Sequence, residues 1–281
     1  MSPVSLDQPE ILNVLFHPYQ STRTPLPDRA TDMDIPIAPG VTLANRLFTA
    51  DQETPTLIFF HGNGETLADY DAIGPQFVQV GLNFLVTEYR GYGWSSGTPT
   101  ASNLLADAEQ LYRELTADLK SQGYSGPFFV MGRSLGSSCA IDLAARHNDD
   151  TDFAGLIIDS GFARTLPLAR TLGLDPDSLG ITEENAFNNE AKIARMTKPT
   201  LILHGREDQL IPLQQAEQLM AACGARAKEL QVIPGADHNS LFAVGGPLYF
   251  QTIKRFVDKA TGADDWRKRR KQFKTRQALG K

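Results

Sequence analysis

The chain has little cysteine and no long apolar run. Cys139 and Cys223 are the only cysteines among its 281 residues, too few for the disulfide framework of a small secreted protein. No run of about eighteen apolar residues occurs, so we expect no transmembrane helix. Hydrophobic residues make up 41% and charged residues 21% of the chain. These values exclude a disordered protein and favour one large domain with a sizeable core.

Signatures of cofactor binding are missing as well. The histidines show neither an H-E-x-x-H motif nor a paired-cysteine spacing, so we expect no metal site. Gly62-Asn63-Gly64 lacks the lysine and the Ser/Thr of a phosphate-binding loop, and we expect no cofactor. The N-terminal MSPVSLDQPE has no basic segment leading into an apolar one. A secretory signal is therefore not expected, and a cytoplasmic location fits best.

Acidic and basic residues are unevenly distributed. The formal net charge is -6, but eight of the 27 lysines and arginines lie in residues 266–281, which hold no acid. This tail, with Trp266 and Phe273, could contact an anionic membrane surface weakly. The alternative is a solvated extension, and no specific nucleic-acid partner is expected.

Short apolar segments alternate with helical patterns along most of the chain. Apolar throughout, these segments predict strands buried on both faces of a mostly parallel sheet, with helices on each side. The predicted strands cover residues 56–61, 83–89, 128–131, 154–159, 200–204 and 229–233.

The remaining segments divide the chain into regions. Residues 1–40 predict an arm that packs on the domain through the apolar stretch 11–16. Residues 41–260 predict the domain itself, beginning with an edge strand at 41–48. Within it, the spacing of apolar residues predicts a helix over residues 67–80. Residues 161–198 break the alternation with Pro167, Pro176 and many small or polar residues, and predict a short lid. Residues 261–281 form the basic tail.

The stretch Gly132-Arg133-Ser134-Leu135-Gly136 follows an apolar strand and opens a helix. In this context G-x-S-x-G predicts a sharp turn that lifts the serine hydroxyl above the end of the strand. Small flanking residues allow the close packing that such a turn needs. The alternative is a turn with two glycines and a capping serine. The strand before it and the helix after it favour the first interpretation, with Ser134 as a nucleophile.

A serine nucleophile needs a base, and the base needs an acid. His238 follows the last predicted strand and is the candidate base. Asp208 follows the strand before it and is the candidate acid. Glu207 and Asp159 also lie near strand ends and remain alternatives for the acid. The chain order of serine, acid and histidine suits a parallel sheet whose loops meet at the carboxyl ends of its strands.

Other residues near the strand ends are expected to have structural roles. We expect His61 and His204 to shape their loops through hydrogen bonds. Tyr89 is expected to pack its loop, with lining of the pocket as the alternative. Arg133 is expected to hold a neighbouring loop by an ion pair, with binding of a substrate carboxylate as the alternative. His17 is expected to lie away from the strand ends.

Five landmarks together resemble the alpha/beta-hydrolase superfamily, and more narrowly its small-lidded esterases and protein depalmitoylases. They are H-G-N-G at 61–64, Y-R-G-Y-G at 89–93, G-R-S-L-G at 132–136, H-G-R-E-D at 204–208 and D-H at 237–238.

The resemblance implies an alpha/beta-hydrolase fold with Ser134, Asp208 and His238 as the catalytic triad. It also implies an oxyanion hole formed by the backbone amides of Asn63 and Leu135. The expected function is cleavage of a carboxylic ester or thioester with a small or lipid-like acyl group, through an acyl-enzyme on Ser134. A peptidase or amidase of the same fold, or a binding protein without turnover, are the alternatives.

Overall fold

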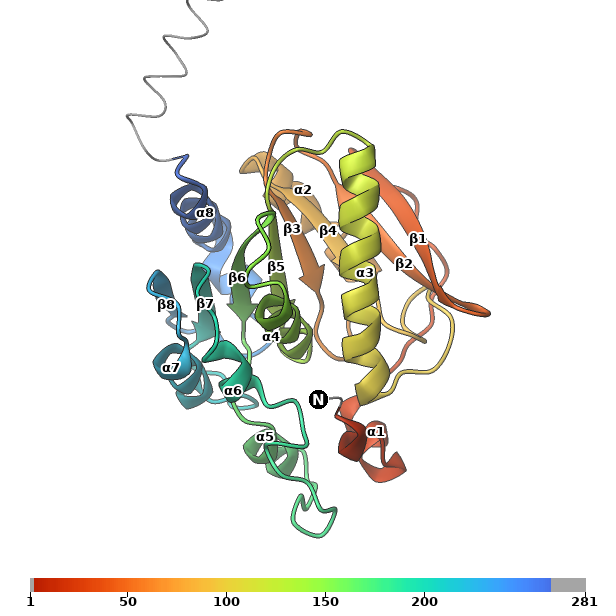
Figure 1. The fold of residues 1–281 in the computed structure, drawn as a ribbon, viewed down its shortest axis with the longest axis vertical. Helices are drawn as coiled ribbons and strands as arrows, with labels where there is room; N and C mark the ends of the chain where they lie inside the picture. Colours follow the sequence, from red (N-terminus) through yellow and green to blue (C-terminus); the bar gives the residue numbers. More distant parts are fainter. Residues whose placement is uncertain (1–2, 264–281) are drawn as a thin grey trace, which may run out of the picture.

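A central eight-stranded sheet organises the molecule (Figure 1). The computed structural model describes residues 3–263 of the chain. The strand order is β1-β2-β4-β3-β5-β6-β7-β8. Pairs from β4 to β8 are parallel, whereas β1–β2 and β2–β4 are antiparallel. The strands are β1 (Ala30–Ala38), β2 (Val41–Phe48), β3 (Thr56–Phe60), β4 (Asn83–Thr87), β5 (Phe128–Arg133), β6 (Phe153–Asp159), β7 (Thr200–Gly205) and β8 (Lys228–Ile233). The predicted fold class is confirmed.

Helices cover both faces of the sheet (Figure 1). Side chains of α3, α4 and α7 pack in one apolar cluster, and those of α2 and α8 in the other. In β3, Ile58 points to the first cluster while Leu57 and Phe59 point to the second, so the strand is apolar throughout. The helices are η1 (Val4–Leu6), α1 (Pro9–Leu15), η2 (Leu67–Tyr70), α2 (Gly74–Gln79), α3 (Ala101–Ser121), α4 (Gly136–Arg146), α5 (Thr165–Thr171), α6 (Asn189–Ile193), α7 (Leu213–Ala222) and α8 (Leu241–Thr261).

The strand predicted at residues 41–48 is confirmed as β2, but β1 lies outside it, so the prediction that it is the edge strand is wrong. The two strands form a hairpin in which Ile35 pairs with Leu43. The expected arm 1–40 therefore contains a strand of the sheet, and its expected boundary divides this hairpin. The sequence analysis did not locate β1 because this strand contains polar residues and Pro36. An edge strand can accommodate both.

The predicted helix between β3 and β4 is two short helices. Helix η2 ends at Tyr70, and α2 begins only at Gly74, with Pro75 in its first turn. A Cβ atom on Gly74 would lie 2.4 Å from the Phe48 ring, so glycine lets this segment pack directly on β2. Proline at the start of α2 fits a new helix better than the interior of a longer one.

The N-terminal segment packs as the sequence predicts, since Ile11 and Phe16 are both buried. Helices α1 and α5 lie at the end of the molecule where the parallel strands finish (Figure 1). The segment between β6 and β7 carries α5 and α6, at the position expected for a lid. The basic tail 266–281 lies outside the described residues. Within residues 3–263, no helix combines the length and apolar character needed to span a bilayer.

Replacing Gly136 tests how closely α4 approaches the sheet. A Cβ atom there would lie 2.1 Å from the Phe60 carbonyl oxygen. We expect Gly136→Ala to lower the free energy of unfolding by about 3 kcal/mol, because neither backbone can yield freely. Urea unfolding measures the loss.

Gly173→Ala is the control, because its Cβ would have no neighbour within 4 Å and only the backbone at φ 85° would be strained. That variant should lose about 1 kcal/mol. Equal losses in the two variants would contradict the close approach.

Candidate active site

Ser134 sits on a strained turn between β5 and α4. Its φ is 50°, in the left-handed region that side chains rarely adopt. The Ser134 amide donates to the Asp159 carbonyl oxygen at 2.9 Å, which ties the turn to the end of β6. A Cβ atom on Gly132 would lie 2.2 Å from the Gly136 carbonyl oxygen, so the turn can close only with glycine there. The sharp turn predicted from G-x-S-x-G is confirmed.

Three side chains from three loops form a continuous chain of contacts. Ser134 Oγ lies 2.9 Å from His238 Nε2, and His238 Nδ1 lies 2.7 Å from Asp208 Oδ2. The other oxygen of Asp208 accepts hydrogen bonds from the amides of Leu210 and Ile211 at 3.0 and 2.8 Å. Asp208 and His238 are buried, whereas Ser134 is partly exposed. The carboxylate is thus held in place, and the hydroxyl remains open to solvent.

The alternative acids lie in other contacts. Asp159 accepts hydrogen bonds from Tyr249 Oη at 2.6 Å and from Ser160 Oγ at 2.9 Å. Glu207 is exposed, next to Asp208 in the chain. The geometry therefore pairs His238 with Asp208.

Two backbone amides near the serine have no protein acceptor. Within residues 3–263, neither the Asn63 amide nor the Leu135 amide donates to another protein atom. Leu135 is the N-cap of α4, where backbone N–H groups favour negative charge. The Asn63 side chain is held by Tyr92 Oη at 2.7 Å and by the His17 amide at 2.9 Å.

An ion pair between the buried Arg133 and the partly buried Glu65 connects the loops of this site. Arg133 Nε donates to Glu65 Oε1 at 2.8 Å, and its Nη1 lies 3.6 Å from Asp159. Glu65 Oε2 also accepts from the Gly62 amide at 2.7 Å and from Tyr70 Oη at 2.6 Å. The expectation that Arg133 holds a neighbouring loop by an ion pair is confirmed. Glu65 itself was not singled out, since a lone loop glutamate has no distinguishing pattern.

Electrostatics keeps this pair ionised. Burial alone would raise the pKa of Glu65, but Arg133, with the hydrogen bonds from Tyr70 and Gly62, holds it below the ordinary value. Burial would lower the pKa of Arg133, and Asp159 and Glu65 together raise it instead. The guanidinium also reaches Asn239, the residue after His238, at 3.5 Å. The pair therefore joins the loops that carry Asn63, Ser134 and His238.

A second buried carboxylate, Glu88, was also missed by the sequence analysis. It follows β4 and accepts hydrogen bonds from the amides of Leu67 and Trp94 at 2.8 and 3.0 Å. Burial raises its pKa to about 7 against these hydrogen bonds. Its contacts are with backbone groups of two loops, which indicates a structural role.

The other histidines and aromatic residues mostly shape loops. His204 Nε2 lies 2.7 Å from the Ile211 carbonyl oxygen, and burial lowers its pKa, so it is neutral. His61 Nδ1 lies 2.8 Å from the Gly62 carbonyl oxygen. Tyr89 Oη donates to the His61 carbonyl oxygen at 2.6 Å. The prediction that these side chains pack and shape loops is confirmed.

His17 differs from the expectation that it lies away from the strand ends. Its Nδ1 is 2.7 Å from Asn63 Nδ2, so the N-terminal segment reaches the loop after β3. Neither periodicity nor a motif could reveal this contact, because residues 17–29 form no helix or strand that the sequence could place. No group of three or more His, Cys, Asp or Glu side chains with metal-binding geometry occurs in the described part of the chain.

A serine on a strained strand-to-helix turn, with an imidazole and a buried carboxylate from the next loops of a mostly parallel sheet, defines an alpha/beta hydrolase. The family model described as "Serine aminopeptidase, S33" matches residues 51–171 and 185–243, and the chain belongs to this alpha/beta-hydrolase family.

Curated relatives and solved structures agree with this assignment. The human protein "Alpha/beta hydrolase domain-containing protein 17B" is 32% identical over 208 residues, which cover 73% of this chain and 66% of the relative. This chain therefore spans just under two thirds of that relative.

Two solved structures show the same fold. An esterase from Pyrococcus furiosus superposes with a TM-score of 0.67 over 87% of this chain and 98% of its own, at 19% identity. A monoglyceride lipase from Saccharomyces cerevisiae superposes with a TM-score of 0.64 over 87% of this chain and 98% of its own, also at 19% identity.

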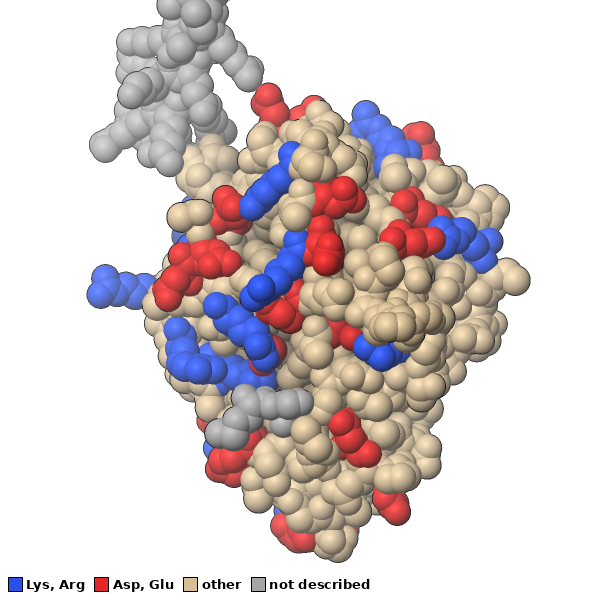
Figure 2. Space-filling view, turned by 45° about the vertical axis from the view of Figure 1, so that its right-hand side comes forward, with Lys and Arg blue, Asp and Glu red and all other residues tan. Residues whose placement is uncertain are grey.

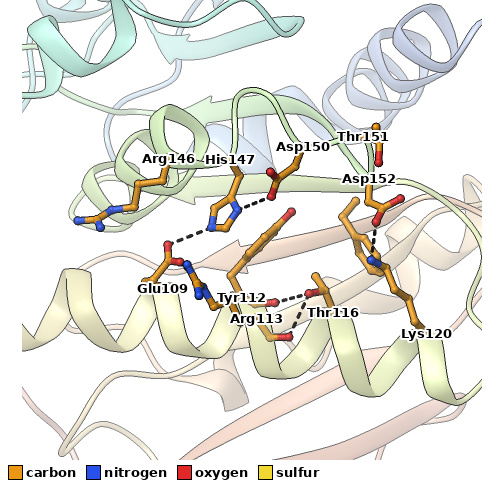
Figure 3. A pocket seen from close by; sticks show the side chains of 11 residues that line it. Glu109, Tyr112, Arg113, Thr116, Lys120, Arg146, His147, Asp150, Thr151 and Asp152 are labelled. Carbon is orange, nitrogen blue, oxygen red and sulfur yellow. Dashed lines mark hydrogen bonds and ion pairs between the residues drawn. The ribbon is translucent and has the colours of Figure 1, made fainter.

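A polar cavity of about 520 Å³ lies apart from these side chains, between α3 and the segment after α4 (Figure 3). In it His147 Nε2 is 3.0 Å from Glu109 and its Nδ1 is 2.7 Å from Asp150. The His147 ring packs on Tyr112, with 4.4 Å between ring centroids. The cationic side chains around it are already paired, such as Arg113 with Glu109. The volume of a cavity alone therefore does not identify the candidate active site.

Contacts of His147 predict how stability depends on pH. The hydrogen bond with Glu109 raises the pKa of His147 despite burial, with a smaller contribution from Asp150. The same contact lowers the pKa of Glu109 to about 2. A raised histidine pKa stabilises the fold below the unfolded value of 6.5, and this contribution is lost as pH rises through the folded value. A lowered carboxyl pKa stabilises above 4.5 and is lost as pH falls toward 2.

We therefore expect His147→Gln to destabilise the protein most between about pH 4.5 and 6.5, by about 1 kcal/mol, because solvent screens part of the interaction. Thermal melting of both proteins across pH 3–9 measures the difference, which should shrink above pH 8. A difference that stays constant across this range would contradict the ionic contribution.

Proposed function

We propose that the protein is a serine hydrolase that cleaves a carboxylic ester or thioester through an acyl-enzyme on Ser134. One observation carries the proposal: the His238 ring bridges Ser134 Oγ at 2.9 Å and Asp208 Oδ2 at 2.7 Å. A serine hydroxyl is a weak nucleophile by itself, and this arrangement supplies both the base and the group that orients it. A protein that only binds a ligand has no use for such an alignment.

In the first step, His238 removes the hydroxyl proton as Ser134 Oγ attacks the substrate carbonyl carbon. The Nδ1–H group of the ring donates a hydrogen bond to Asp208, which holds the tautomer in which the Nε2 lone pair faces the serine. Asp208 also stabilises the imidazolium that forms. Its own position is fixed by the two loop amides that bond its second oxygen.

The negative charge on the substrate oxygen is stabilised by the amides of Asn63 and Leu135. Support comes from their unused N–H groups and from the place of Leu135 at the start of α4. One such donor contributes about 3–4 kcal/mol to the transition state.

His238 then gives its proton to the leaving alcohol or thiol, and the carbonyl forms again as the acyl-enzyme. Water attacks this intermediate by the reverse route. His238 takes a proton from the water, and Ser134 leaves as the hydroxyl. Every proton passes through Nε2 of one imidazole, so no second acid or base is required.

The choice of ester or thioester over amide follows from the neighbours. The two superposed structures are those of an esterase and of a monoglyceride lipase. The matching family description names an aminopeptidase, so amide cleavage is the second candidate. Comparison of p-nitrophenyl esters with amino-acid p-nitroanilides separates the two, since the same triad would act on both.

Removal of the nucleophile tests the reaction directly. Ser134→Ala should abolish covalent labelling by a fluorophosphonate probe and reduce ester hydrolysis at least 10³-fold. Ser160→Ala is a matched control, because Ser160 also follows a strand with φ 50° but its hydroxyl donates to Asp159. That variant should label like the unmodified protein. Full labelling of the Ser134→Ala protein would show that another residue is the nucleophile.

Glu65 is proposed as a positioning residue for the oxyanion loop. Glu65→Gln removes the charge that pairs with Arg133 while keeping a similar shape. We expect kcat for p-nitrophenyl acetate to fall about tenfold with KM changed less than threefold, because the oxyanion exists only in the transition state.

The control for this change is Glu190→Gln, which breaks an exposed pair with Arg164. It should leave kcat unchanged. Assays are run well below both melting temperatures. A Glu65→Gln protein that melts earlier but keeps kcat within twofold has lost stability alone, and the positioning role would then be wrong.

A further inference from the structure

A small apolar cavity lies between the N-terminal segment and the segment that follows β6. Its volume is about 30 Å³, close to the share of one water molecule in the liquid. One wall consists of Leu6, Ile11, Val14 and Leu15, and the other includes Phe162 and Leu168. Thr165 is the one polar residue among those that line the cavity. Such a lining suits hydrocarbon and offers nothing to a charged group.

Both walls lead back to the candidate active site. Two residues after Leu15, the His17 amide donates to Asn63 Oδ1 at 2.9 Å, and two residues of chain span at most about 7 Å. On the other wall, Phe162 comes three residues after Asp159, whose carbonyl accepts from the Ser134 amide at 2.9 Å. The two segments that line the cavity therefore lead, within a few residues, to the loop that carries Asn63 and to the turn that carries Ser134.

Few polar contacts hold the two walls together. Ser5 Oγ donates to the Asn185 carbonyl oxygen, and Gln8 Nε2 donates to the Leu179 carbonyl oxygen at 3.0 Å. Neither wall is a strand of the sheet, so α1 and α5 can move apart without breaking any strand pairing. Separation of these two walls, whose contact we call the seam, would make room for a chain of methylene groups.

The surrounding surface favours an uncharged chain. In Figure 2 the lower end of the molecule, where Figure 1 places α1 and α5, shows mainly uncharged side chains with scattered Asp and Glu and little Lys or Arg. The basic side chains on and beside α5 are already paired, Arg164 with Glu190 and Arg170 with Asp177.

We propose that the linear acyl chain of the substrate binds between α1 and α5, with the N-terminal segment as one wall of the site. This inference rests on the proposed function, since it places the acyl carbonyl at Ser134. It assigns residues 6–15 to substrate recognition, and it predicts that kcat/KM rises by up to about fourfold for each methylene that enters the seam.

A pair of matched substitutions tests the seam. Val14→Trp fills it, whereas Val4→Trp places the same side chain on the same segment at a residue that is 64% exposed and does not line it. With p-nitrophenyl esters from acetate to dodecanoate, Val14→Trp should lose at least tenfold in kcat/KM for octanoate and decanoate. Its activity on acetate should stay within twofold, and Val4→Trp should match the unmodified protein throughout.

Binding is measured separately, so that failure of the seam and failure of the proposed reaction give different results. A fluorescent dansyl-undecanoic acid should bind the Ser134→Ala protein, and adding Val14→Trp should weaken this binding at least tenfold. Binding without hydrolysis of any ester would reject the proposed function and support the seam. Equal binding, or equal chain-length profiles, in the Val14→Trp and Val4→Trp proteins would reject the seam.

Leu168→Ala is a second test that does not depend on whether the Val14→Trp protein folds, because it enlarges the seam and creates no clash. It should shift the preferred acyl chain toward longer esters. A profile unchanged from that of the unmodified protein would also count against the seam.

Discussion

The left-handed turn at Ser134 is the constraint on which the site depends. A residue with φ 50° costs free energy, so its surroundings must hold it there. Close contact of Gly132 with the Gly136 carbonyl does so from within the turn, and the Asp159 carbonyl does so from β6. The same close packing sets Leu135 at the start of α4. The turn at Ser134 and the N-terminus of α4 are thus fixed by one local geometry. Neither depends on the loops that carry His238 and Asp208.

Those loops are fixed by a second device, the buried Glu65–Arg133 pair. A buried ion pair is favourable only when its remaining hydrogen-bonding groups are satisfied. Glu65 meets this condition with contacts to Gly62 and Tyr70. Arg133 meets it only in part, because its Nη1 lies 3.6 Å from Asp159 and has no hydrogen-bond partner among the described residues. Since Arg133 directly precedes Ser134, any displacement of Glu65 acts on the loop that carries Asn63 and on the turn at Ser134 together. The pair therefore couples two parts of the site that the sheet alone would hold only through separate strands.

Sequence patterns predicted the parts of this protein that follow local rules. Apolar runs located the parallel strands, because a strand buried on both faces has no polar alternation to obscure it. The G-x-S-x-G turn was identifiable because its geometry demands glycines at fixed positions. Strand β1 was not located because polar residues interrupt its apolar pattern. Its place in the sheet depends on pairing with β2, and no local pattern encodes that pairing. The break after Tyr70 depends on the Phe48 ring against Gly74, a contact between distant segments.

Charged residues behind the site were invisible for the same reason. Glu65 and Glu88 are single acids in loops, where most acids are solvated, and only tertiary burial distinguishes them. Their partners explain why burial is tolerated: Glu65 has Arg133, whereas Glu88 has backbone amides and a pKa raised to about 7. An ionised Glu65 can orient a cation, while Glu88 gains most from accepting hydrogen bonds that close its loops. Two similar carboxylates thus have different surroundings, and Glu65 is the one whose charge pairs with the residue before Ser134 and whose contacts reach the loop that carries Asn63.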